Sequence, residues 1–279
     1  MAVVSGGPVN AHRTLARGSA LLLTLVFTGA VASAQGRGAA PQGRAGGPPA
    51  APPSPRAAAL ADLTGQWVSL VTEDWRYRMF TAPKGDTVSV PLNPNGQKAA
   101  TTWDPARDEA AGEQCKAYGA AGIMRMPGRL RVTWQDDTTL KIETDTGTQT
   151  RLLRFGTPFG EAGSWQGVSV ASWEYPRAPV AARGVGPGPT AGPAPGGTMK
   201  VVTTQMRPGY MRRNGVPHSA NAVMTEYFDR LEVPGGDTLL VIAAEIADPE
   251  YLGTPYWTST QFKRQNDASG WNPTPCAAR

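Results

Sequence analysis

The sequence predicts an all-β protein, folded as an up-and-down antiparallel barrel of about eight to ten strands. Three observations lead to this class. Apolar and polar residues alternate with a period of two along most of residues 66–264, which is typical of strands with one buried face. Connections between successive strands are short, and closure removes the exposed edges of so large a sheet. A helical insertion around residues 95–118 interrupts the strand pattern once.

We expect the barrel to occupy residues 59–279 as a single domain. Residues 1–34 contain Arg13 and Arg17 but no acidic residue, and an apolar run of about a dozen residues leads to a small-x-small ending. This run is too short to cross a bilayer of roughly 30 Å, so we interpret it as a signal peptide, with an uncleaved membrane anchor as the alternative. Residues 35–58 are rich in Pro and Gly and are predicted to form a disordered tail.

A second Pro- and Gly-rich segment, residues 177–198, lies within the domain. It contains no aromatic and no acidic residue, so we expect a flexible loop at the barrel rim. A linker between two independent domains is the alternative interpretation.

The charge of the chain limits its partners. The net charge is +5, and it falls to +3 when Arg13 and Arg17 leave with the signal peptide, which is too low to indicate nucleic-acid binding. The signal peptide predicts a secreted, periplasmic protein whose mature chain has no transmembrane segment. The three arginines of the 35–58 tail would give it a weak association with an anionic envelope surface.

The domain begins with two predicted strands, at residues 66–72 and 75–80. A helix follows from Asp104, because this residue can cap it, Pro105 suits the first helical position and acidic residues occupy the first turn. The helix is expected to continue to Tyr118, and a shorter helical turn over 96–103 precedes it.

Residues 129–155 are predicted to form a three-stranded meander. Leu130, Val132 and Trp134 alternate with polar residues, and a polar turn leads to a second alternating run that contains Leu140 and Ile142. The later strands are expected at about 165–175, 199–206, 222–232, 238–247 and 256–264.

The chain contains two cysteines, Cys115 and Cys276. In an oxidising compartment we expect them to form a disulfide, with a catalytic thiol as the alternative. Cys115 lies in the insertion at residues 92–126, which would serve as a lid or end plug of the barrel. The disulfide would therefore fasten that element to the carboxyl-terminal segment.

The stretch Leu63-Thr64-Gly65-Gln66-Trp67-Val68 resembles the Gly-x-Trp signature that opens lipocalin-like barrels. In that family the Trp packs at the closed end of the barrel beneath an Arg from near the last strand. The resemblance therefore implies a cation–ring contact between Trp67 and Arg264.

Several other stretches resemble a group of uncharacterised secreted bacterial proteins. They include Glu73-Asp74-Trp75-Arg76, Pro208-Gly209-Tyr210, Asp248-Pro249-Glu250 and Trp271-Asn272-Pro273, and the likeness spans most of residues 60–279. This resemblance implies an exported single domain and no particular activity.

The common catalytic and cofactor motifs are absent from the sequence. It has no Gly-x-Ser-x-Gly, no phosphate-binding Gly-x-x-x-x-Gly-Lys, no Cys-x-x-Cys and no His-Glu-x-x-His, so we expect neither a metal nor another cofactor. His218 is the only histidine after the signal peptide, which leaves it as the one candidate base of its kind. A solvent-exposed turn is the ordinary interpretation of its Asn214-Gly215 and Pro217 surroundings.

Residues 73–78 form the most suggestive cluster. On a strand, Arg76 and Arg78 would share one face and Trp75 and Tyr77 the other, so the barrel would receive either two guanidinium groups or two aromatic rings. Inward arginines would suit a carboxylate or phosphate ligand. The alternative is an amphipathic strand whose arginines lie in water.

Three carboxyl and phenol groups are the remaining catalytic candidates. Glu226 and Tyr227 lie on a strand whose two faces are both largely apolar, so one of these polar side chains is expected to be buried or at the rim. Asp74 and Glu226 would also suit glycoside hydrolysis, if the fold brings the two carboxylates to the required separation.

Three functions are compatible with these observations. The first is a secreted lipocalin-like barrel that binds a small lipophilic or aromatic molecule, oriented by Arg76 or Arg78. The second is a lyase, isomerase or hydrolase on the same barrel that uses Asp74, Glu226, Tyr227 or His218. The third is an envelope accessory protein that binds a partner with its outer surface. The candidate wall or lid residues of the first function are Trp75, Tyr77, Tyr118, Tyr227 and Trp257.

Overall fold

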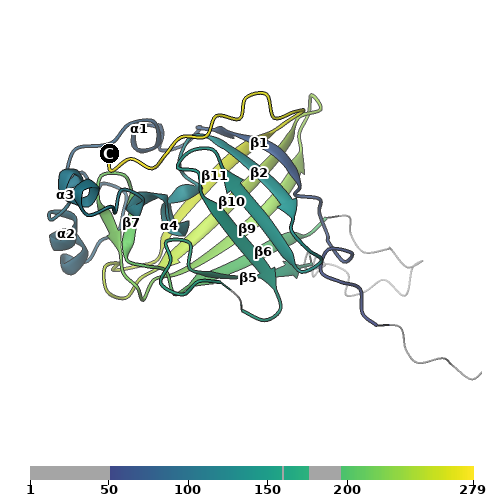
Figure 1. The fold of residues 1–279 in the computed structure, drawn as a ribbon, viewed down its shortest axis with the longest axis horizontal. Helices are drawn as coiled ribbons and strands as arrows, with labels where there is room; N and C mark the ends of the chain where they lie inside the picture. Colours follow the sequence, from purple (N-terminus) through teal and green to yellow (C-terminus); the bar gives the residue numbers. More distant parts are fainter. Residues whose placement is uncertain (1–50, 159, 176–195) are drawn as a thin grey trace, which may run out of the picture. The chain divides into compact units, whose positions relative to one another are not determined.

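Nine strands close into a barrel, which confirms the predicted fold class (Figure 1). A computed structural model describes residues 51–158, 160–175 and 196–279; the predicted signal peptide, most of the tail and nearly all of the 177–198 segment lie outside this part of the chain. The order of the strands around the barrel is β1-β11-β10-β9-β6-β5-β4-β3-β2. Their bounds are β1 Gly65–Leu70, β2 Arg129–Trp134, β3 Thr139–Thr144, β4 Thr150–Phe155, β5 Val168–Glu174, β6 Thr198–Thr204, β9 Val223–Glu232, β10 Thr238–Ala247 and β11 Tyr256–Gln265.

One pair of neighbours departs from the antiparallel arrangement. β4 and β5 run parallel, with Leu153 opposite Ser169 and Phe155 opposite Ala171, whereas the other neighbouring strands are antiparallel. An odd number of strands cannot alternate in direction all the way around a closed sheet, so a nine-stranded barrel needs a parallel pair. The parallel pair is therefore a consequence of the strand number.

The interior of the barrel is packed with side chains. Inward residues from all nine strands belong to one apolar cluster, which includes Trp67, Leu153, Met199, Phe228 and Ile242, each with 0% exposure. Full burial of one such side chain contributes about 1.5–3 kcal/mol to folding, so this cluster is the main stabilising feature of the domain.

Trp67 lies at the end of the barrel where the chain enters β1. Its indole Nε1 donates to the Leu63 carbonyl at 3.1 Å, and the Arg264 guanidinium carbon lies 5.7 Å from the centre of its ring system. Trp67 and Arg264 are also partners in the β1–β11 register. The contact that the Gly-x-Trp resemblance implies is therefore present, although a shared contact shows no family membership.

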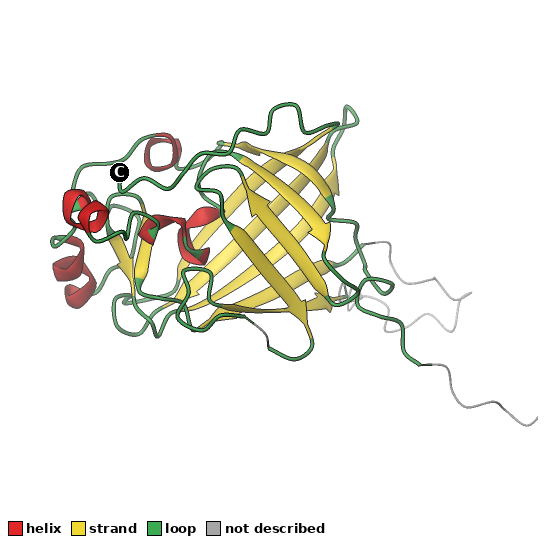
Figure 2. Ribbon diagram, in the orientation of Figure 1, coloured by secondary structure: helices red, strands yellow, loops and turns green. Residues whose placement is uncertain are grey.

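Short helices and a small hairpin gather at the other end of the barrel and form what we call the cap (Figure 2). Residues 71–128 and 205–222 make up the cap, and several elements of this part are packed against one another. No helix among the described residues is long and apolar enough to cross a membrane. The elements of the cap are α1 Trp75–Met79, α2 Pro94–Ala100, α3 Pro105–Ala110, the 3-10 helix η1 Lys116–Tyr118, α4 Ala120–Ile123, and the paired strands β7 Gly209–Arg212 and β8 Val216–His218.

The predicted strand at residues 75–80 is wrong, because this segment forms α1. Asp74 adopts a left-handed conformation, with φ 49°, and turns the chain away from the barrel immediately after β1. The turn carries Arg78 into the cap, where its buried guanidinium bonds to main-chain carbonyls. The alternation of Arg and aromatic residues over 75–78 therefore reflects one helical turn and not the two faces of a strand.

The predicted helix from Asp104 is shorter than expected. Asp104 accepts hydrogen bonds from the backbone N–H groups of Ala106 and Arg107, as a capping residue does, but α3 ends at Ala110. Gly112 follows with φ +70°, a conformation that stops a helix and that glycine adopts at little cost. The chain then turns into η1 and α4, so the insertion holds several short helices.

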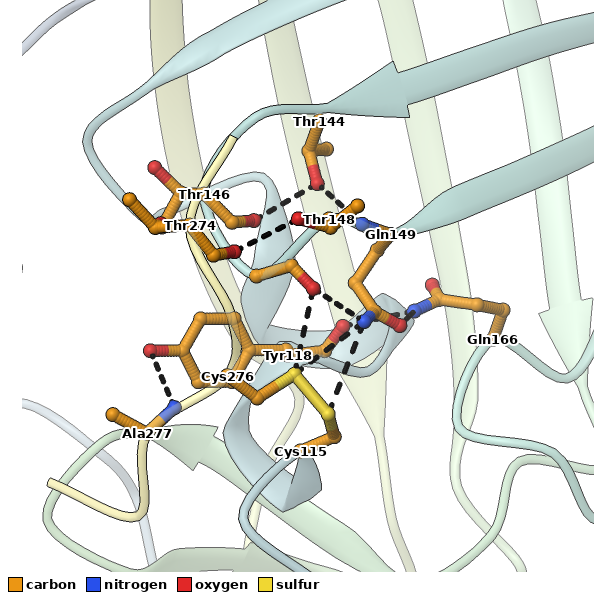
Figure 3. The surroundings of a disulfide bond; sticks show 11 residues. Cys115, Tyr118, Thr144, Thr146, Thr148, Gln149, Gln166, Thr274, Cys276 and Ala277 are labelled. Carbon is orange, nitrogen blue, oxygen red and sulfur yellow. Dashed lines mark hydrogen bonds between the residues drawn. A yellow bond between two sulfur atoms is a disulfide. The ribbon is translucent and has the colours of Figure 1, made fainter. Parts of the chain in front are cut away.

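The disulfide between Cys115 and Cys276 is present, as predicted (Figure 3). Cys115 precedes η1, and Cys276 belongs to the carboxyl-terminal segment, which runs along the outside of the barrel to the cap (Figure 1). Arg131 of β2 stacks on Trp271 of this segment, with 4.4 Å from the guanidinium carbon to the ring centre. The carboxyl-terminal segment is thus attached both to the barrel wall and to the cap.

Candidate functional site

Four arginines surround one small cavity in the cap. The cavity has a volume of about 20 Å³, which is enough for one water-sized group. Its arginines come from three places in the chain: Arg78 from α1, Arg125 from the segment between α4 and β2, and Arg212 with Arg213 from the β7–β8 hairpin. The lining is completed by Tyr77, Gly122, Met126 and Met211.

Arg78 is the most deeply buried of the four, with 2% exposure. Its Nε donates to the Arg125 carbonyl at 3.0 Å, and its Nη1 donates to Glu73 Oε1 at 3.0 Å. Its Nη2 is buried and has no hydrogen-bond partner among the described residues. Burial is the main cause that lowers the pKa of Arg78, and the charge of Arg125 lowers it further, while Glu73 opposes the shift.

Arg125 is 8% exposed and has a similar shortage of partners. Its Nη2 donates to Asp74 Oδ2 at 2.6 Å, whereas its Nη1 is buried without a partner in the described part of the chain. Two neighbouring guanidinium groups thus each carry an unused N–H donor.

Arg212 supplies a third unused donor. Its Nη1 donates to the Val88 carbonyl at 2.8 Å, and its Nη2 donates to the Tyr256 hydroxyl at 3.3 Å, but its buried Nε lacks a partner within the described segments. The guanidinium carbon lies 4.1 Å from the centre of the Tyr77 ring, a stacking distance that fixes the plane of the group. Arg213 closes the cluster by donating from Nη2 to the Arg78 carbonyl at 2.9 Å.

Negative charge does not balance these cations. Glu73 pairs with Arg78, and Asp74 pairs with Arg125. Within the described part of the chain, neither Arg212 nor Arg213 forms an ion pair. Burying a cation without a counter-ion is costly, so this arrangement favours an anionic group that would accept the unused hydrogen bonds.

The structure distributes the sequence-predicted ligand-binding residues over different surfaces. Tyr77 and Arg78 line the cavity, and Tyr118 is buried beside the disulfide, where its hydroxyl accepts from the Ala277 N–H. The other members of the predicted set point elsewhere: Trp75 and Arg76 are exposed on α1, Trp257 is exposed on β11, and Tyr227 contacts Lys200 on the outside of β9.

Glu226 and Asp74 take part in separate ion pairs. Glu226 is 1% exposed and receives two hydrogen bonds from Arg151 inside the barrel, with Nη1–Oε1 3.0 Å and Nη2–Oε2 2.6 Å. Asp74 is held by Arg125 in the cap. Each carboxylate of the pair considered for glycoside hydrolysis is therefore engaged with a different arginine.

His218 is buried, with 1% exposure, so the expectation of a solvent-exposed turn is wrong. It lies in β8 opposite Gly209 of β7 and lines a second cavity, of about 190 Å³, together with Lys116, Tyr210 and Tyr251. Its Nδ1 lies 3.1 Å from the Ser219 carbonyl. Burial lowers the pKa of His218 and favours the neutral imidazole, although the Ser219 carbonyl and Asp248 oppose this shift.

Sequence reasoning missed three of the four arginines of the cavity. Arg125 and Arg212 each lie next to methionine in a short segment without strand or helix periodicity, at Met124-Arg125-Met126 and Met211-Arg212, and Arg213 directly follows Arg212. An arginine among apolar residues in a loop is a signal of burial. The segments that carry these arginines are far apart in sequence, so only the fold brings them together.

Comparison with known proteins found no protein-family model, no curated protein and no solved structure that matches the chain.

Proposed function

We propose that this is a secreted binding protein for a small molecule with a carboxylate or phosphate group, and that the arginine-lined cavity of the cap holds this group. The observation that carries the proposal is the set of three buried guanidinium groups around one cavity, each with an N–H that has no partner in the described structure. Arginine is suited to such ligands because its planar group offers several donors in a fixed geometry.

The size of the cavity limits how the ligand binds. About 20 Å³ admits a single oxygen-sized group, so one oxygen of the ligand enters while the rest stays at the mouth. Each hydrogen bond from a charged donor contributes roughly 1.5–3 kcal/mol. Two or three such bonds would give the anionic group most of its affinity.

The packed interior supports a site in the cap over one within the barrel. The inward positions hold large apolar residues such as Trp67, Met199 and Phe228, all fully buried. A lipophilic ligand would have to displace these side chains, whereas an anion at the cap supplies acceptors to donors that lack them. The disulfide, which is typical of exported proteins, supports the secreted setting.

Isothermal titration with phosphate and with acetate at low salt tests this function. We expect Arg125→Gln to weaken binding of the preferred anion at least tenfold, since about 1.4 kcal/mol per lost interaction corresponds to that factor. Arg125→Lys retains the charge beside Asp74 but not the planar fork, and it should also lose affinity while remaining folded.

Arg107→Gln is the matched control, because Arg107 is exposed on α3 and does not line the arginine cavity. Its loss changes the net charge by the same amount. The proposal fails if neither anion binds to the wild-type protein, or if Arg107→Gln weakens binding as much as Arg125→Gln does.

A further inference from the structure

We infer that α1 and the loop after it form a docking surface for an anionic lipid bilayer. Only one part of this inference rests on the proposed function, namely that an anionic group of the lipid enters the arginine cavity. The docking surface itself consists of Trp75, Met79, Phe80 and Val88.

These four side chains are unusually exposed for apolar residues. Trp75 is 60% exposed, Met79 51%, Phe80 61% and Val88 64%, and they come from one short stretch of the chain. The rings of Trp75 and Phe80 are in edge contact, with centroids 6.3 Å apart, so these two rings form one continuous apolar surface. A contiguous apolar patch of this kind marks an interaction site.

The docking surface is held in place from behind. On the inner side of α1, Arg78 is buried in the cap, and the Tyr77 ring is stacked under Arg212. Asp86 accepts hydrogen bonds from Arg76 and from the Tyr77 hydroxyl, which ties the loop that carries Val88 to the helix. Rotating α1 to bury Trp75 would break the contacts of Arg78, so the apolar side chains remain outward.

Basic residues outnumber acidic ones in the part of the cap that carries the docking surface. The three acids of this region, Glu73, Asp74 and Asp86, are each paired with an arginine. In the described part of the chain, the neighbouring cations Lys84, Arg212 and Arg213 form no ion pair. The region therefore carries an excess of basic charge, and each basic residue near an anionic membrane contributes about 1 kcal/mol to binding.

The size of the patch favours a bilayer over a protein partner. A stable protein interface takes about 800 Å² and roughly 20–30 residues from each partner, whereas the docking surface consists of four side chains. A membrane interface needs only a few aromatic and apolar side chains with basic residues around them, because these insert between the headgroups. The phosphate oxygens of the lipids are also the kind of group that the arginine cavity accepts.

Vesicle sedimentation tests the inference with the purified protein. We expect binding to vesicles of phosphatidylcholine with 30 mol % phosphatidylglycerol, a composition of roughly one anionic lipid in three, and at least tenfold weaker binding to pure phosphatidylcholine. The double variant Trp75→Ala/Phe80→Ala should lose at least tenfold in binding to the anionic vesicles. Both side chains are exposed, so the core and the unfolding temperature should be unaffected.

Trp257→Ala is the matched control, since Trp257 is 58% exposed on β11 and lies outside the docking surface. It should bind vesicles as the wild type does. Brominated lipids should quench part of the tryptophan emission of the wild type and of Trp257→Ala, and less of that of the double variant.

The results separate the two proposals. If phosphate binds and the anionic vesicles do not, the docking surface is refuted while the anion site stands. If vesicles bind through Trp75 and Phe80 but neither free anion binds, the docking surface stands and the anion site fails. Equal loss of vesicle binding in Trp257→Ala and in the double variant would also refute the docking surface.

Discussion

Arg151 and Glu226 form a buried ion pair in which the desolvation penalty of the two charges opposes their mutual attraction. Both side chains are 1% exposed inside the barrel, and Arg151 also approaches the Thr203 hydroxyl, which in turn bonds to Ser169. Removing both charges from water carries a penalty that their mutual attraction offsets only because the geometry is bidentate. The pair therefore adds little net stability, but removing only one of its two charges leaves the other buried without a partner and destabilises the protein.

We expect Glu226→Gln to lower the free energy of unfolding by about 3–5 kcal/mol, because it leaves Arg151 buried without its counter-ion. The double variant Arg151→Met/Glu226→Leu should recover most of this loss. Urea unfolding measures both, and Glu232→Gln, in the exposed Arg230–Glu232 pair, is the control with an expected change below about 1 kcal/mol. A Glu226→Gln protein as stable as the wild type would contradict this account.

His218 makes stability depend on pH. Burial lowers its pKa in the folded protein below the ordinary value near 6.5, so the unfolded chain binds more protons as the pH falls below about 6.5. Stability is thus retained above about pH 6.5 and decreases as the pH falls towards the folded-state pKa, by up to about 1.4 kcal/mol per pH unit. Urea unfolding from pH 7.5 to 5.5, roughly the window in which histidine titrates, should show this slope. In His218→Asn the slope should be much smaller, and an unchanged slope would exclude His218 as its source.

At the scale of elements, the sequence predicted most of the strands and few of the cap elements. The meander at 129–155 and the three last strands lie within a few residues of their predicted positions. One solvent-exposed and one buried face of a strand give its apolar residues a period of two, which the sequence shows. Helix α1 was not predicted, because five residues are too few to show a helical period. The β7–β8 hairpin was missed for a related reason, since strands of four and three residues are too short to show an alternating pattern.

Loss of the disulfide should reveal how the cap is held. Replacing Cys115 and Cys276 by serine opens a loop with a sequence separation of 161 residues, and the chain-entropy model gives a loss of about 4–5 kcal/mol in the free energy of unfolding. Thermal and urea unfolding of Cys115→Ser/Cys276→Ser measure the loss. A change below about 1 kcal/mol would show that the other contacts of the carboxyl-terminal segment hold it without the covalent bond.

At the scale of the whole molecule, the barrel has one weak strand pairing, between β4 and β5, which we call the seam. β4 and β5 share three registered residue pairs, whereas β9 and β10 share ten. Short parallel pairings bury fewer backbone hydrogen bonds, and regions with few such bonds open first. Closure of the barrel could be predicted from the sequence. The position of the parallel pair could not, because it depends on which two neighbouring strands run in the same direction.

Hydrogen exchange followed by mass spectrometry locates this seam. We expect amides of Leu153–Phe155 and Ser169–Ala171 to exchange faster than those in the middle of β9 and β10, because opening of the barrel begins where its ladder is shortest. Peptides from the β1–β11 pair, which has five registered positions, serve as an internal reference. Equal protection around the whole barrel would argue against a preferred opening point.

The attachment of the last segment to the cap determines when the fold can be covalently closed. Cys276 follows β11, so its thiol is synthesised after every strand of the barrel. With two cysteines in the chain, each molecule has a single internal pairing and no wrong partner to exchange with. The cap is therefore the final part to be covalently locked, and pulse-labelled chains should show oxidation as the last step of their biogenesis.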